Sequence, residues 1–170
     1  MSARRDPEED DFRALIARNA PALGRLVRHY EAEPEAQRDL EQEILIALWR
    51  ARSSFRAEST ERTWVYRIAH NVAASHIAKA IRMRRDSDGA PEAPAPPSPR
   101  SPDAIAEERG ELRRLDERIR AFDLPTRQLV LLALEGCTTA EIAAVTGLSP
   151  TNVTTRLSRI RKQLAEEPEA

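Results

Sequence analysis

The sequence predicts an all-α protein of two small helical domains that a flexible proline-rich linker joins. Alanine, leucine, arginine and glutamate dominate the 170 residues, and all four favour helix. Apolar residues recur with helical spacing on both sides of a stretch that holds six of the twelve prolines. The 41% apolar content is sufficient for compact cores of modest size. We therefore expect a first domain over 10–85, a disordered linker over 86–103 and a second domain over 104–165.

The first segment is charged over residues 1–9, which predicts disorder there. From Asp10 to Tyr30 apolar residues follow a helical period. Pro21 interrupts this pattern, so we expect a kink or two short helices. Residues 31–35 are predicted to form a turn.

A strong helix is predicted from Glu35 to about Arg52. Leu40, Ile44 and Leu48 fall on one stripe at 100° per residue, which predicts a core-facing side. A second face carries polar residues with large apolar neighbours: Asp39, Gln42, Glu43, Ile46 and Trp49. The polar residues are either a solvated face, with the tryptophan covering a neighbouring loop, or an acid-rimmed apolar site for a protein partner.

The next helix is predicted from Glu61 to Arg85, after a loop over 53–60 in which Ser59 or Thr60 acts as N-cap. Its broad apolar side starts with Trp64. The opposite face carries Thr63, Arg67, His70, Asn71 and Ala74, followed by several basic residues. Arginine and asparagine can bond to bases or phosphates, although a solvated basic face that caps its own helix is the alternative. The three histidines have no metal-ligand spacing, so we expect them at the surface or boundary.

The linker over 86–103, fully extended, would reach roughly 56 Å, which exceeds one DNA helical turn of about 34 Å. Beyond it, the second domain is predicted to start near Asp103 with an amphipathic helix that ends at Leu124-Pro125. A second helix follows over Thr126–Leu134 and stops at Gly136.

A helix-turn-helix pattern closes the chain. Thr138 and Glu141 form a capping box before a short helix over 139–145, Gly147 makes the turn, and Ser149-Pro150 starts a helix over 150–164. The N-terminal part of such a helix enters the DNA groove, and the outward residues are Thr151, Asn152, Thr154, Thr155, Arg156, Ser158 and Arg159. A plain helical hairpin with a soluble outer face is the alternative.

The charge distribution supports binding to a polyanion. The net charge is only −1, but residues 49–85 carry nine bases and two acids, and residues 150–164 carry four bases and no acid. The single cysteine, Cys137, excludes an internal disulfide and a cysteine-based zinc site. We find no catalytic constellation, signal-peptide core or membrane-length apolar run. These observations predict a cytoplasmic protein that is not an enzyme and needs no cofactor.

Three segments in order resemble bacterial RNA polymerase sigma factors of the extracytoplasmic-function subgroup. They are DLEQEILIALWR, FRAESTERTWVYRIAHNVA and LPTRQLVLLALEGCTTAEIAAVTGLSPTNVTTRLSRIRKQL. The resemblance covers roughly residues 11–85 and 103–165. It implies a promoter-specificity subunit with two helical domains.

The resemblance also implies partners and site residues. The helix over 39–50 would dock on the clamp helices of core RNA polymerase through Asp39, Gln42, Glu43, Ile46 and Trp49. The loop and helix after it would open the downstream promoter element and capture an unpaired base, through Phe55, Arg56, Ser59, Trp64, Arg67, His70 and Asn71. The helix-turn-helix would read the upstream element in duplex DNA and contact the polymerase flap. An anti-sigma factor or another inhibitor is a further implied partner.

Two alternatives remain open at this point. A stand-alone transcription regulator would use only the helix-turn-helix, and Asp39, Gln42 and Glu43 would then be a solvated face. A polymerase-binding adaptor would not touch DNA at all.

Overall fold

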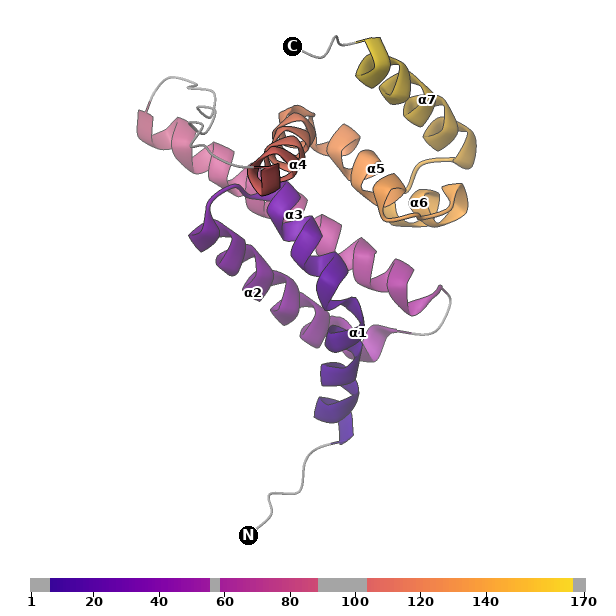
Figure 1. Cartoon of the computed structure of the whole chain (residues 1–170). Coiled ribbons are helices and arrows are strands. Elements are labelled where there is room, and N and C mark those ends of the chain that lie inside the picture. Colours follow the sequence, from indigo (N-terminus) through magenta and orange to yellow (C-terminus); the bar gives the residue numbers. More distant parts are fainter. Residues whose placement is uncertain (1–6, 56–58, 89–103, 167–170) are drawn as a thin grey trace.

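The computed structural model describes residues 7–55, 59–88 and 104–166, and all regular elements in these ranges are helices. The first domain contains α1 (Pro7–Tyr30), α2 (Pro34–Ala51), the short 3-10 helix η1 (Arg52–Ser54) and α3 (Glu61–Asp88). Figure 1 shows α1 and α2 lying along α3. The predicted stripe of α2 is confirmed as core, and the completely buried apolar side chains of α2 and α3 are Leu40, Ile44, Leu48, Val65, Ala69 and Ala73.

Helix α1 differs from the sequence-based prediction. It is one continuous helix that contains Pro21 and begins at Pro7, so the predicted alternative of two short helices is wrong, and residues 7–9, which were predicted to be disordered, are helical. Proline removes one backbone hydrogen bond from a helix. Leu23, Leu26 and Val27 lie beyond it and are buried. Their packing offsets the local preference for a break, as tertiary context often does.

The second domain contains α4 (Ala104–Ala121), α5 (Leu124–Leu134), α6 (Thr139–Thr146) and α7 (Pro150–Glu166). The predicted capping signals are confirmed. Thr138 and Glu141 form the reciprocal capping box of α6, and Gly147 ends that helix with φ 74°. Only a residue without Cβ adopts this left-handed conformation at little cost, so the glycine fixes the turn between α6 and α7.

The two domains are in contact. Helix α4 packs against α1, and α6 packs against α3 (Figure 1). Of the predicted linker, residues 89–103 lie outside the described residues, and residues 86–88 belong to α3. None of the described helices combines the length and the apolar character that crossing a lipid bilayer requires.

Candidate functional site

A groove between α2 and α3 collects four of the five residues predicted to bind a protein partner. Its volume is about 360 Å³, and its lining residues are Asp39, Gln42, Glu43 and Ile46 of α2 with His76, Lys79, Ala80 and Met83 of α3. Ile46 is 49% exposed and Met83 is 60% exposed. Exposed apolar side chains beside carboxylates suit a partner that offers both an apolar contact and positive charge.

His76 links this groove to the segment between α1 and α2, and sequence reasoning did not single it out. Its Nδ1 lies 3.1 Å from Glu43 Oε2, and its Nε2 lies 3.4 Å from Glu31 Oε1. The imidazole therefore holds the position of Glu43 in the groove wall. These partners are 33 and 45 residues away in sequence, and no local pattern relates them.

Trp49 lies outside the groove. The Phe12 ring packs edge-on against it with centroids 5.0 Å apart, and the Arg52 guanidinium lies 3.8 Å from its ring centroid. Such contacts are typical of a structural tryptophan that joins two helices and a loop. The structure therefore separates Trp49 from the other four residues of the predicted set.

The start of α3 carries the residues predicted for the downstream element. Trp64 is 7% exposed and packs on Phe55, with ring centroids 5.4 Å apart. Ser59 accepts a hydrogen bond of 3.4 Å from Arg67, and Arg67 and Asn71 are exposed. Arg56 lies outside the described residues. An arginine, an amide and an aromatic pair thus lie along one edge of the first domain.

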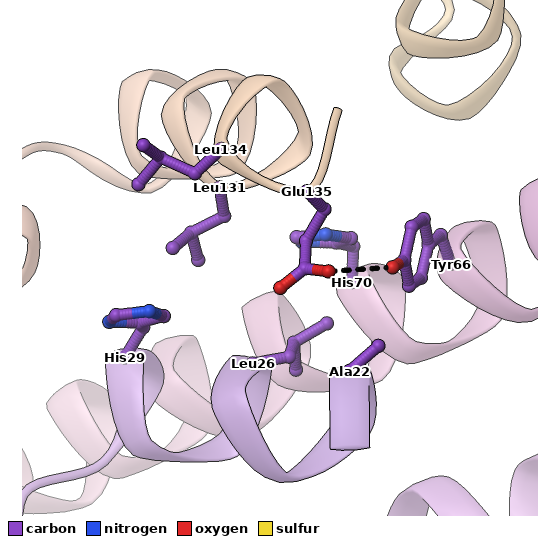
Figure 2. A pocket seen from close by; sticks show the side chains of 8 residues that line it. All are labelled: Ala22, Leu26, His29, Tyr66, His70, Leu131, Leu134 and Glu135. Atoms are coloured by element: carbon purple, nitrogen blue, oxygen red, sulfur yellow. Dashed lines mark hydrogen bonds between the residues drawn. The ribbon is translucent and has the colours of Figure 1, made fainter. Parts of the chain in front are cut away.

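His70 does not share that exposed edge. The sequence places it on the polar face, but its side chain is 2% exposed, and Tyr30 Oη lies 3.0 Å from its Nδ1. Burial lowers the pKa of His70 to about 3, so the imidazole is neutral at pH 7. The predicted surface position is wrong because α1 and the second domain cover this side of α3, as Figure 2 shows.

The outward face of α7 matches the prediction. Val153 and Ile160 are buried in the core of the second domain. Ser149 caps the helix, because its hydroxyl oxygen accepts a hydrogen bond of 3.3 Å from the backbone N–H of Asn152. Every residue of the predicted readout set is exposed. The hydroxyls of Thr154 and Thr155 donate to carbonyls one turn earlier, so these side chains present methyl groups and acceptor lone pairs outward.

The described residues contain no group of three or more His, Cys, Asp or Glu side chains that could hold a metal ion. The surfaces described above are an acid-rimmed groove, a polar and aromatic edge, and an exposed capped helix with three arginines.

Comparison with known proteins gives these surfaces a context. The model of "Sigma-70 region 2" matches residues 15–83, and the model of "Sigma-70, region 4" matches residues 112–164. The chain is 44% identical over 66 residues to the RNA polymerase sigma-H factor of Pseudomonas aeruginosa, a match that covers 39% of this chain and 34% of that protein. It is 26% identical over 173 residues to the RNA polymerase sigma factor NccH of Alcaligenes xylosoxydans xylosoxydans, covering 95% of this chain and 90% of that protein.

Solved structures agree with the family models. CnrH in complex with the cytosolic domain of CnrY superposes with a TM-score of 0.66 at 26% identity, covering 92% of this chain and 86% of that one. The matched regions carry the groove, the edge of α3 and the helix-turn-helix in the expected order. The chain belongs to the RNA polymerase sigma factors of the extracytoplasmic-function type, non-enzymatic proteins that direct promoter recognition and transcription initiation.

Proposed function

We propose that three separate surfaces of this sigma factor bind its three partners. The groove formed by α2 and the end of α3 binds core RNA polymerase, the exposed edge of α3 binds the opened strand of the downstream promoter element, and α7 reads the upstream element as duplex. The groove carries this proposal most directly, because Asp39, Gln42, Glu43 and Ile46 remain exposed around a shared hollow. A factor that acted through its helix-turn-helix alone would have no use for such a hollow.

The edge of α3 has the chemistry that an unpaired base requires. The half-buried Phe55 ring, which packs on the buried Trp64, provides a stacking surface, and Arg67 and Asn71 provide hydrogen bonds to base edges or phosphates. Ser59 orients the Arg67 guanidinium. Arg56 belongs to the same loop and is proposed to contact the strand. His70 is buried and holds α3 against Tyr30 of α1, so it is not proposed to contact the DNA.

Trp49 supports the polymerase groove from outside it. The indole packs between Phe12 and Arg52, so it holds the end of α2 against α1. On this proposal its replacement weakens polymerase binding through the position of α2 and not through a lost contact with the partner.

An inhibitor that contacts the same surfaces is part of this proposal. A relative of known structure, CnrH, is seen with the cytosolic domain of CnrY, and a structure of RpoE from Bartonella quintana holds the anti-sigma factor NepR. We propose that this chain also has an anti-sigma partner and that it acts in the cytoplasm, where core polymerase and promoter DNA are found.

The test measures binding to purified core polymerase. The double substitution Asp39→Ala/Glu43→Ala removes both groove carboxylates, and we expect the dissociation constant to rise about ten-fold or more, in the range of interface hot spots. The matched control is Glu35→Ala/Glu41→Ala, which removes two exposed carboxylates of α2 that do not line the groove.

Equal losses in the two double variants would contradict the groove assignment. If the wild-type chain does not bind core polymerase but still binds a promoter duplex, the stand-alone regulator is the correct description. If it binds polymerase and the α7 arginines have no effect on promoter binding, the adaptor is correct.

A further inference from the structure

Two contacts of one imidazole join the turn after α1 to the polymerase groove. His76 of α3 places Nδ1 3.1 Å from Glu43 Oε2 and Nε2 3.4 Å from Glu31 Oε1, so each ring nitrogen faces a carboxylate. The ring donates to Glu43 when Nδ1 carries a proton, and to both carboxylates when both nitrogens do. We call these two contacts the His76 bridge.

The Glu31 end of the bridge is fixed by its backbone. The Glu31 N–H donates to the Val27 carbonyl in the last turn of α1, at 2.9 Å. The Glu31 carbonyl accepts from Gln37 Nε2 at 3.0 Å, and the same amide reaches the Ala32 carbonyl at 3.3 Å. The Glu31 side chain is only 17% exposed. A carboxylate on such a turn has little freedom, so it can anchor the imidazole.

The Glu43 end of the bridge faces the groove and the solvent. The Glu43 side chain is 45% exposed, whereas that of His76 is 16% exposed. An exposed glutamate has several rotamers available and loses this freedom when it is fixed. A carboxylate has about four lone-pair sites, so Glu43 can accept from His76 and still accept from a cationic partner. The bridge therefore restrains the carboxylate without blocking it.

The two carboxylates of the groove differ in this respect. Asp39 lines the same hollow one helical turn before Glu43, and Lys79 lines it one turn after His76. Among the described residues, the bridge includes Glu43 and not Asp39. The groove thus contains one carboxylate that the imidazole restrains and one that it does not, which allows a direct comparison.

We propose that His76 is a positioning residue for polymerase binding and that it acts through Glu43. The bridge holds this carboxylate in the orientation that the partner engages, so the side chain is ordered before the partner arrives. Ordering one such side chain in advance is worth roughly two- to ten-fold in affinity. This inference rests on the proposed function of the groove. It adds α3 and the turn after α1 to a site whose carboxylates lie on α2.

The experiment measures the dissociation constant of the full chain for purified core polymerase. His76→Leu removes both contacts, and we expect the dissociation constant to rise about five-fold. His76→Asn keeps a donor close to the Nδ1 position, so it should recover most of the affinity, to within about two-fold of wild type. The matched control is Ser75→Leu, which places the same side chain at the neighbouring exposed position outside the groove and should bind as wild type does.

A double-mutant cycle separates positioning from general support of the groove. In a Glu43→Ala background, His76→Leu should change the dissociation constant by less than about 1.5-fold, because no carboxylate remains to be held. In an Asp39→Ala background, the same substitution should keep its effect of about five-fold. Equal effects in the two backgrounds, or an asparagine variant as weak as the leucine variant, would overturn the positioning role.

Nitrogen NMR of the free chain tests the bridge without polymerase. The ring signals of His76 are those that the spectrum of His76→Asn lacks. Glu43→Gln and Glu31→Gln should each shift these signals, whereas Asp39→Asn should shift them much less. Signals that respond equally to all three substitutions, or to none, would overturn the bridge. Thermal melting checks that each variant is folded, and Glu31→Gln, which weakens the anchor of the ring, replaces His76→Leu in the cycle if the leucine variant does not fold.

The outcomes distinguish this inference from the proposed function. If Glu43→Ala and Asp39→Ala both bind core polymerase as tightly as the wild type, the groove assignment fails and the positioning role fails with it, while the NMR result still decides whether His76 holds Glu43. If both substitutions weaken binding and His76→Leu has the same effect in each background, the groove assignment stands and only the positioning role is refuted.

Discussion

The two helices proposed to meet DNA, α3 and α7, hold their polar residues in different ways. On α7 the hydroxyls of Thr154 and Thr155 bond back to their own helix, and the arginines point into solvent. On α3 the polar residues bond to other elements: Glu61 to Arg18, Tyr66 to Glu135, and His70 to Tyr30. A helix that reads duplex DNA needs its polar side chains exposed. A helix that supports strand opening must also be anchored to the core of its domain by other side chains.

The largest expected effect tests the buried side of α3 through its pH dependence. The pKa of His70 is lowered from 6.5 to about 3 by burial, so the unfolded chain takes up this proton first. The contribution of neutral His70 is therefore present above pH 6.5 and is lost as the pH falls from 6.5 towards 3. Between pH 6.5 and 4.5 we expect the free energy of unfolding to fall by at most about 3 kcal/mol from this residue.

Denaturant unfolding of the wild type and of His70→Asn over this pH range checks the prediction. Asparagine keeps a polar partner for Tyr30 but does not titrate, so its slope should be shallower. The control is His76→Asn, which removes a groove histidine of the same helix and leaves the Tyr30 contact intact. A variant slope as steep as that of the wild type would place the sensitivity elsewhere.

The next largest effect tests the exposed face of α7. Arg156→Ala/Arg159→Ala should weaken binding to a promoter duplex by roughly ten- to a hundred-fold and reduce the salt slope by about two, one for each lost phosphate contact. Stability should remain unchanged, because both side chains are exposed. Binding isotherms at several salt concentrations measure it. A large loss of stability would mean that α7 also depends on long-range partners.

The smallest effect concerns the local order of the helix-turn-helix. Thr138→Ala removes the capping box of α6 and should cost about 1 kcal/mol of unfolding free energy. Thr139→Ala, at the next exposed position, should cost a few tenths at most. Thermal melts of the two variants give the difference. If both variants melted alike, the box would be a geometric feature of little energetic weight.

These contrasts explain what the sequence could predict. Some features depend only on residues a few positions apart. They are the capping box, the turn at Gly147, the exposed residues of α7, and the α2 stripe of Leu40, Ile44 and Leu48. Those predictions are confirmed. The uninterrupted α1 depends on packing beyond Pro21, which a local breaker rule ignores.

The candidate site was predictable only in part, because some of its contacts join residues that are far apart in the sequence. Four groove residues share one face of α2, so helical spacing grouped them correctly. His70 was misplaced because Tyr30, which contacts it, lies 40 positions earlier in the sequence. The contact of Trp49 with Phe12 spans 37 positions, so helical spacing within α2 could not indicate it. The pairing of Arg25 with Glu135 spans 110 positions, and no periodicity indicates it.

The single thiol near the contact between the two domains has a practical consequence. Cys137 is the single cysteine of the chain, and burial raises the pKa of its thiol, an effect that the nearby Arg62 opposes. Because Arg62 belongs to the first domain, separation of the domains would change the surroundings of this thiol and thus the rate of its alkylation by a neutral reagent such as a maleimide. The unmodified protein thus carries its own chemical reporter, which can follow domain separation during polymerase assembly without any label or substitution.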